Sequence, residues 1–306
     1  MGECYFYKMY SLLVRSAFQL RECCSSSVGR YDVEISEGCL STNLKREVFS
    51  RDIRKISSME YIVKIEGVAY FQICEGRRIV VEPIGQRQDK MIRLYLLGPI
   101  FNLLLNQNGG LLIHASCLGY FNGCFVLAAP SGTGKSTLAA TFLNCEEYVL
   151  LADDVCLVSY SNAGEPIIQP AYPRLKLLPD TIGRIEFARE VFERISSENS
   201  KYNVLVHSRF QNKALPLKNI FILEEIACDS IDIKVLTGKA KISALLNNLY
   251  WIGDQLNIVK RDMTFTQVSQ LVAYCDVSIV RFSKKNHVPS QVVERIIDFL
   301  NNCTEQ

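Results

Sequence analysis

The chain has 306 residues, which suits two domains or one large α/β unit and excludes a single small domain. Hydrophobic residues make up 48% and charged residues 22%, a balance that supports a packed core and excludes general disorder. With 34 Lys and Arg against 32 Asp and Glu, the formal charge is only +2, so bulk electrostatics favour neither nucleic acid nor a membrane as partner. Any bound anion therefore needs a local site.

The first ninety residues are rich in short β-leaning runs. The dipeptide Glu75-Gly76 predicts a hairpin turn between the last two of these runs. We therefore expect a β-rich N-terminal module over residues 1–90, with a possible role in binding a peptide or partner, and a second domain over residues 91–306. The expected strands are Tyr31–Ser36, Tyr61–Lys64, Val68–Cys74 and Arg78–Glu82.

A long uncharged stretch opens the second domain, because residues 94–134 contain no Asp, Glu, Lys or Arg. Gly, Pro and Asn interrupt it, so it holds no apolar segment of the roughly 20 residues that span a membrane, and we expect a buried core. The run Met91–Leu97 fits either a strand or a helix. Pro99 predicts the first residue of a helix to Gln107, ended by Asn108-Gly109-Gly110.

Beyond that turn the pattern is typical of an α/β domain. Apolar runs without alternation predict strands covered on both faces at Leu111–Cys117 and Cys124–Ala128, joined by a hairpin at Asn122-Gly123. A helix over 134–144 and a strand Val149–Ala152 complete a βαβ unit. The polar stretch 182–211 predicts a short helix near 185–195 and a loop through 196–202. Further predicted elements are strands Leu217–Leu223, Ile231–Leu236 and Val277–Phe282, and helices Lys239–Leu249, Thr266–Cys275 and Ser290–Asn301.

The twelve cysteines form no CxxC pair, and several stand inside apolar runs. Residues 1–10 lack the basic start and apolar stretch of a secretory signal. We therefore expect mostly buried free thiols and a cytoplasmic protein.

The strongest chemical signal is the sequence APSGTGKST at 129–137, which follows a buried strand and opens a helix. This is the context of a Walker A loop, in which glycines let backbone N–H groups surround phosphate oxygens at the positive end of the helix dipole. Lys135 is expected to lie near the β- and γ-phosphates, and the Ser136 hydroxyl is expected to ligate Mg²⁺. The pattern's first glycine is replaced by Ala129. The predicted nucleotide-binding residues are Ser131, Gly132, Thr133, Gly134, Lys135, Ser136 and Thr137.

Paired carboxylates follow the next predicted strand, at Asp153 and Asp154. Their distance from Lys135 along the chain places them at the carboxyl end of a strand beside the loop, where open α/β sheets carry their chemistry. Successive strand residues point in opposite directions, so we expect one acid to accept a proton and the other to anchor Mg²⁺. His114 lies on the preceding apolar strand, where a lone histidine is usually a core residue.

Together, these segments resemble the catalytic domain of the HPr kinase/phosphorylase family and, more distantly, the P-loop of phosphoenolpyruvate carboxykinase. The resemblance rests on LLIHAS, FVLAAPSGTGKST and YVLLADDV, and covers about residues 90–285. The resemblance extends to the related lasso-peptide precursor kinases. It rests there on four segments, which are YLLGP (95–99), LLNQNGGLLIHAS (104–116), QPAYPRLKL (169–177) and PLKNIFIL (216–223).

This resemblance implies ATP-dependent, Mg²⁺-dependent phosphorylation of a serine by a P-loop kinase domain of the HPr kinase and carboxykinase-like fold. Asp153 then matches the proton acceptor, Asp154 the acid tied to the metal, and His114 a residue that orients or polarises Asp153. Arg174 and Lys176 are candidates for holding nucleotide or acceptor phosphate, with a solvated basic loop as the alternative.

Two departures separate the chain from HPr kinases themselves. Thr137 stands where that family has Glu, and Pro170–Leu177 replaces the glycine-rich segment that contacts HPr. We therefore expect a ribosomal precursor peptide as the acceptor. The alternatives are HPr or a small hydroxylated molecule as acceptor, and a sensor that binds ATP without turnover. We expect neither nucleic acid nor a membrane as partner, and a homo-oligomer is compatible with the sequence.

Overall fold

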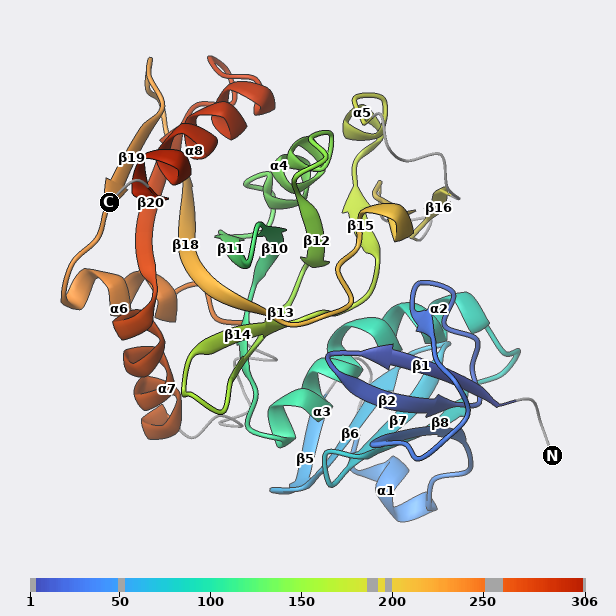
Figure 1. The fold of residues 1–306 in the computed structure, drawn as a ribbon. Helices are drawn as coiled ribbons and strands as arrows, with labels where there is room; N and C mark the ends of the chain where they lie inside the picture. The colour runs from blue at the N-terminus through green and yellow to red at the C-terminus, as the bar shows by residue number, and fades with distance from the viewer. Residues whose placement is uncertain (1–3, 49–52, 186–191, 196–199, 251–260, 305–306) are drawn as a thin grey trace. The chain divides into compact units, whose positions relative to one another are not determined.

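The computed structural model describes all residues except 1–3, 49–52, 186–191, 196–199, 251–260 and 305–306. It is a mixed α/β structure that divides into two compact units (Figure 1). The first comprises residues 1–112 with 251–263, and the second comprises 113–250 with 264–306. The division thus falls at Leu112, later than the expected boundary at residue 90.

The first unit is built on an eight-stranded sheet with the order β3-β1-β2-β4-β8-β7-β6-β5. The pairs β2–β4 and β4–β8 are parallel and the others are antiparallel. The predicted hairpin is confirmed, because Glu75 and Gly76 both have positive φ between the paired strands β7 and β8. The strands are β1 (Tyr5–Met9), β2 (Leu12–Ser16), β3 (Cys24–Ser25), β4 (Val33–Glu37), β5 (Ile53–Ser57), β6 (Glu60–Ile65), β7 (Ala69–Cys74) and β8 (Arg78–Pro83).

Helices follow the sheet and explain where the boundary falls. The ambiguous run is helical, in α2 (Asp89–Tyr95), and continues through a π-helical turn (Leu96–Ile100) into α3 (Phe101–Gln107); a short helix α1 (Thr42–Arg46) lies earlier in the chain. The backbone kinks at Leu97 and Gly98, directly before Pro99, so regular α-helix resumes at Phe101 rather than at Pro99. The Gln107 side chain bonds the Gly76 amide, which ties α3 to the N-terminal sheet.

The second unit contains a nine-stranded sheet whose main path has the order β12-β10-β11-β18-β14-β13-β9, with β20 joining β18 to β19. The expected single strand Leu111–Cys117 is instead broken at His114, whose N–H bonds the carbonyl of Asn248. The strands are β9 (Leu111–Ile113, across the unit boundary), β10 (Ala115–Tyr120), β11 (Gly123–Ala128), β12 (Val149–Ala152), β13 (Cys156–Tyr160), β14 (Pro166–Gln169), β18 (Leu215–Glu225), β19 (Asp232–Val235) and β20 (Asp276–Phe282).

The pairing directions bring three chain segments to one sheet edge. β10 is antiparallel to both β11 and β12, so these two strands run in the same direction on either side of it. Ala115 faces Ala128, and Cys117 faces Ala152. The residues that follow β11 and β12 and the residue before β10 therefore share one edge, as the predicted βαβ unit requires.

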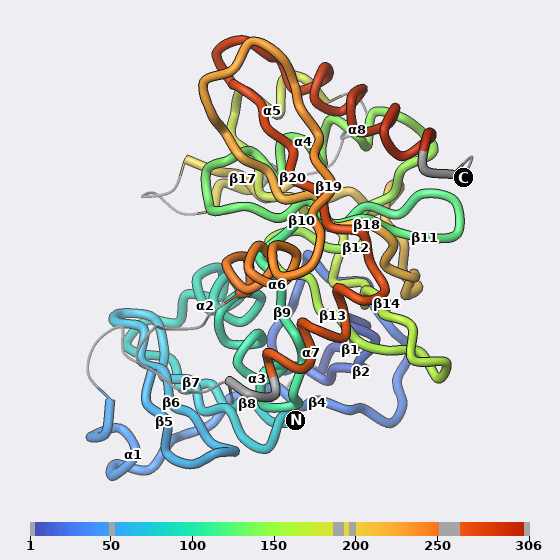
Figure 2. The backbone as a smooth tube through the Cα atoms, turned by 90° about the vertical axis from the view of Figure 1, so that its left-hand side faces the viewer, coloured from blue at the N-terminus to red at the C-terminus, as the bar shows by residue number. Residues whose placement is uncertain are grey.

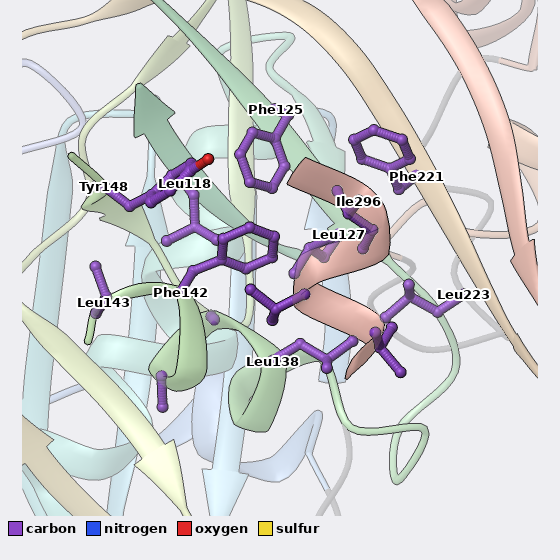
Figure 3. Packing of buried hydrophobic residues seen from close by; sticks show 14 of the residues in the cluster. Leu118, Phe125, Leu127, Leu138, Phe142, Leu143, Tyr148, Phe221, Leu223 and Ile296 are labelled. Carbon is purple, nitrogen blue, oxygen red and sulfur yellow. The ribbon is translucent and has the colours of Figure 1, made fainter. Parts of the chain in front are cut away.

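Helices α4 (Lys135–Phe142) and α8 (Pro289–Thr304) lie against each other on this sheet (Figures 1 and 2). Their buried side chains form one core with alternate residues of the strands, and Figure 3 shows Phe125, Phe142 and Tyr148 gathered there. The ring of Phe142 lies 5.1 Å from that of Phe125 and 5.0 Å from that of Tyr148, both edge to face. This packing fixes α4, and with it the loop that precedes the helix.

A second, three-stranded sheet with the order β15-β17-β16 was not predicted; its strands are β15 (Arg174–Leu177), β16 (Phe192–Arg194) and β17 (Tyr202–Leu205). The expected helix at 185–195 falls largely outside the described residues, and 192–194 are extended. The remaining helices are α5 (Pro179–Ile182), a 3₁₀ turn (His207–Arg209), α6 (Lys239–Leu246) and α7 (Arg261–Tyr274).

The cysteine prediction is confirmed in the described part of the chain, where the eleven cysteines are free thiols and six are buried. Among the helices that the structure describes, none is both long and apolar enough to cross a bilayer.

Candidate functional site

The loop between β11 and α4 contains two glycines with positive φ. Gly132 and Gly134 have φ of +89° and +110°, a region that residues with a Cβ rarely adopt. Ala129, at the first position of the pattern, is not among the positive-φ residues, so alanine fits there without strain. The departure at Ala129 therefore leaves the loop geometry intact.

The first residues of α4 place a cation and a hydroxyl beside this loop. The buried Lys135 donates from Nζ to the carbonyl oxygens of Ala129 and Pro130, at 2.7 and 3.1 Å. Gly134 precedes the helix and offers no side-chain cap, so the first N–H groups of α4 face the loop with the positive end of the helix dipole. This combination is suited to binding phosphate oxygens.

Asp153 connects the loop to the end of β12. Its Oδ1 accepts hydrogen bonds from the hydroxyls of Ser136, at 2.9 Å, and Ser116, at 2.6 Å. Its Oδ2 accepts one from the backbone N–H of Lys176 at 3.0 Å, and the side chain is buried. Both oxygens are thus engaged inside the protein. The sequence prediction did not include Ser116, although its place two residues after His114 was the available signal.

Asp154 turns the other way. It is a non-glycine residue with a φ of +78°, and its Oδ2 lies 2.6 Å from the ammonium nitrogen of Lys176. The ring nitrogen Nδ1 of His114 lies 3.0 Å from the Asp154 carbonyl oxygen and 3.9 Å from its Oδ1. The two acids therefore occupy opposite sides of the strand end, as expected from their adjacency, but with different neighbours from those that the resemblance implies.

The charges of these groups depend on one another. Burial alone would raise the pKa of Asp154, but Lys176, Arg174 and His114 together lower it far below its ordinary value. Burial, followed by the charge of Lys135, lowers the pKa of His114. Burial is also the main cause that lowers the pKa of Lys135 to about 8. At neutral pH, Asp154 is therefore ionised and His114 is favoured in its neutral form.

A cavity of ≈ 350 Å³ joins these groups. The loop and the start of α4 (131–138) form one wall, and His114, Asp154 and Lys176 form another. Phe282, Pro289 and Val292 provide an apolar end, at β20 and α8. Its size and its mixture of apolar and convergent polar groups are typical of a small-molecule site.

The expected site residues separate into two groups. Those that line the cavity are Ser131, Gly132, Thr133, Gly134, Lys135, Ser136, Thr137, His114, Asp154 and Lys176. Asp153 and Arg174 are buried behind this wall, and the Arg174 guanidinium lies over the Tyr172 ring, 4.8 Å from its centroid. The Thr137 hydroxyl lies 3.2 Å from that of Thr181 in α5.

The cavity also has cationic lining residues that the sequence prediction did not include, namely Arg184, Lys201 and Lys284. Lys284 Nζ donates to the carbonyl oxygen of Gly132 at 2.8 Å and pairs with Glu225 at 2.5 Å. No local motif marks these positions, because strand pairing and helix packing bring them to the loop.

No family model matches the chain, and no curated protein matches it. One similar solved structure is that of the HPr(Ser) kinase/phosphatase from Coxiella burnetii. It is 11% identical, with a TM-score of 0.35, and the similarity covers 63% of this chain and 98% of that one.

Proposed function

We propose that this chain is an ATP-dependent phosphotransferase that transfers the γ-phosphate of ATP to a hydroxyl group. The observation that carries the proposal is the hydrogen bond from Ser136 to Asp153. It joins the phosphate-binding end of α4 to the acid at the end of β12, in a cavity that Asp154 also lines. This arrangement of loop, hydroxyl and carboxylates is the one that phosphoryl transfer uses.

The residues present fit a nucleotide with its divalent ion. Gly132 and Gly134 leave open space where a Cβ would stand, apart from the Lys284 side chain 3.8 Å from the Gly134 position. Within the described residues, no three His, Cys, Asp or Glu side chains form a metal site of their own. Mg²⁺ would accordingly be held by Ser136, by Asp153 behind it and by the phosphates, and would neutralise charge on the phosphate oxygens.

The contacts favour a division between the acids that reverses the one implied by the resemblance. Asp153 is buried against Ser136, which suits the metal side. Asp154 lines the cavity and keeps Oδ1 on the side of His114. We assign Asp154 to the incoming hydroxyl: as the new O–P bond forms and the bond to ADP breaks, the hydroxyl proton passes to Asp154. Its lowered pKa is compatible with this role, because positioning contributes more than basicity to a loose transition state.

The proposed acceptor carries a hydroxyl group. A serine of a ribosomal precursor peptide remains our preferred acceptor on the basis of the sequence resemblance, with HPr and small hydroxylated molecules as alternatives. We propose a cytoplasmic location on the basis of the free thiols.

The test is to incubate the purified chain with Mg²⁺ and γ-labelled ATP, offering in turn a peptide that contains serine, HPr and free serine. Wild-type protein should label one of these acceptors. The Lys135→Met variant should lose ATP binding, and the Asp154→Asn variant should keep binding and lose transfer. A chain that binds ATP but labels nothing with any acceptor, water included, would be a nucleotide sensor, and the phosphotransferase proposal would fail.

A further inference from the structure

We propose that Lys201 is a second catalytic cation, which contacts the transferred phosphoryl group and stabilises its charge during transfer. This inference rests on the proposed function, and it concerns a residue outside both the Walker A loop and the acid pair. Three observations support it: the register of the small sheet, the anchoring of the Lys201 backbone, and the presence of Lys201 and Lys135 in the lining of one cavity.

The register places Lys201 on the cavity side of the sheet. In the antiparallel pair β15–β17, Lys176 faces Asn203 and Leu177 faces Tyr202, so continuing the pairing brings Lys201 opposite Leu178. The backbone at Leu178 is still extended, with φ −75° and ψ 154°. Residues two apart on a strand share a face with their directly opposed partners. Lys176 and Leu178 both line the cavity, and Lys201 lines it with them.

The Lys201 backbone is held by regular structure. Its carbonyl oxygen accepts a hydrogen bond from the N–H of the buried Ile195 at 3.0 Å, and β17 begins at the next residue. The Lys201 side chain is partly buried, whereas Arg184, another cation of the cavity lining, is exposed. Because the backbone at Lys201 is fixed, its ammonium group needs little reorganisation to interact with charge that develops in the cavity.

Lys201 and Lys135 line the same cavity, together with the loop residues 131–134. Two cations that line one cavity are stabilised most when a group of high negative charge lies between them. The γ-phosphoryl group in transfer is such a group.

The experiment compares Lys201→Met, Lys201→Arg and wild type in two measurements that need no known acceptor. One is the slow hydrolysis of Mg·ATP, with water as acceptor. The other is the binding of ADP, Mg²⁺ and fluoroaluminate, which imitate the phosphoryl group in transfer, compared with the binding of ADP and Mg²⁺ alone. Lys213→Met serves as the control, because Lys213 is exposed and does not line the cavity.

For a transition-state contact, we expect Lys201→Met to lower turnover and fluoroaluminate-dependent binding by about 10²-fold. Binding of ADP alone should change by less than about threefold, because the contact is made only with the transferred group. Lys201→Arg should restore most of both losses, and Lys213→Met should behave as wild type.

Two outcomes would overturn the inference while leaving the proposed function in place. In the first, Lys201→Met turns over ATP and binds fluoroaluminate as wild type does. In the second, it loses ADP binding and fluoroaluminate binding equally, which would make Lys201 a ground-state ligand. If wild-type protein binds no Mg·ATP at all, the proposed function fails and this inference fails with it.

Discussion

Replacing each acid in turn by its amide tests the proposed assignment of Asp153 to the metal and Asp154 to the acceptor hydroxyl. In Asp153→Asn, the amide oxygen can still accept from the Ser116 and Ser136 hydroxyls, but the NH₂ group then faces the N–H of Lys176, which Oδ2 bonds at 3.0 Å in the native protein. Two donors cannot pair, so a buried N–H loses its partner at a cost of about 1–3 kcal/mol. The protein should remain folded but less stable.

The larger expected effect of Asp153→Asn is on the metal. In the proposed site, Asp153 would act on Mg²⁺ through Ser136, which it bonds, and outer-shell partners of this kind typically change metal affinity by about 10–100-fold. Titrating ATP with and without Mg²⁺ gives the factor by which the metal strengthens binding. We expect this factor to fall about 10–100-fold in Asp153→Asn, while ATP without metal binds at least as well as to wild type, because a negative charge has been removed.

Asp154→Asn is the matched comparison, since it removes the same charge one residue later. It should retain the Mg²⁺ effect on ATP binding and lose turnover, because Asp154 lines the cavity and contacts Lys176 rather than Ser136. If Asp154→Asn abolishes the metal effect and Asp153→Asn preserves it, the assignment made from these contacts is reversed.

Three further changes test other parts of the structure. Ser116→Ala removes a buried hydrogen bond to the Asp153 carboxylate, of a kind worth about 1.5–3 kcal/mol. If this bond holds Asp153 in place for the reaction, turnover should fall about tenfold or more while ATP binds normally without Mg²⁺, and unchanged turnover would contradict that positioning. Burial alone would raise the pKa of Glu82, but Lys45 and a backbone amide lower it, so ionised Glu82 contributes stability that is lost as the pH falls below about 4. Urea unfolding should therefore show Glu82→Gln less stable than wild type at pH 7 and similar to it near pH 3. Glu22 lies 2.9 Å from Arg93, and both side chains are buried. In chemical unfolding, Glu22→Ala should lower the free energy of unfolding by about 3–5 kcal/mol, because it leaves Arg93 buried without this partner. The double variant Glu22→Leu with Arg93→Met should recover most of that loss.

The conformation of the loop 129–137 and the place of the acid pair after a strand were predictable because both depend on short stretches of sequence. Positive φ at Gly132 and Gly134 is a requirement that the sequence satisfies with glycine. The acids directly follow the apolar strand that leads back to the sheet after α4. This strand, β12, has the predicted bounds. Short loops and an unalternating apolar pattern leave few other arrangements.

Contacts made by pairing distant strands were not predictable in the same way. The β1–β2 hairpin turns at Tyr10 and Ser11, which have φ of +52° and +60° without any glycine or asparagine to signal the turn. No strand was expected around Lys176 or Lys201, and residues 196–202 were expected to form a loop, yet β15 contains Lys176 and β17 begins directly after Lys201. The short strands β15 and β17 are stabilised by pairing with each other and by the burial of Leu175 and Val204. A prediction from local sequence patterns does not include this kind of contact.

The roles proposed for the two acids depend on one backbone angle. Strand alternation predicts that neighbouring residues point apart, but not which of them faces the cavity. The φ of +78° at Asp154 decides this, and such a conformation costs about 1–3 kcal/mol in a residue with a Cβ, although aspartate tolerates it better than most. The contact with Lys176 and the bond between His114 and the Asp154 carbonyl offset that cost. Glycine at 154 would avoid the strain but would bring no carboxylate into the cavity. The strain is therefore more consistent with a carboxylate required by the chemistry of the site than with one required for the stability of the turn.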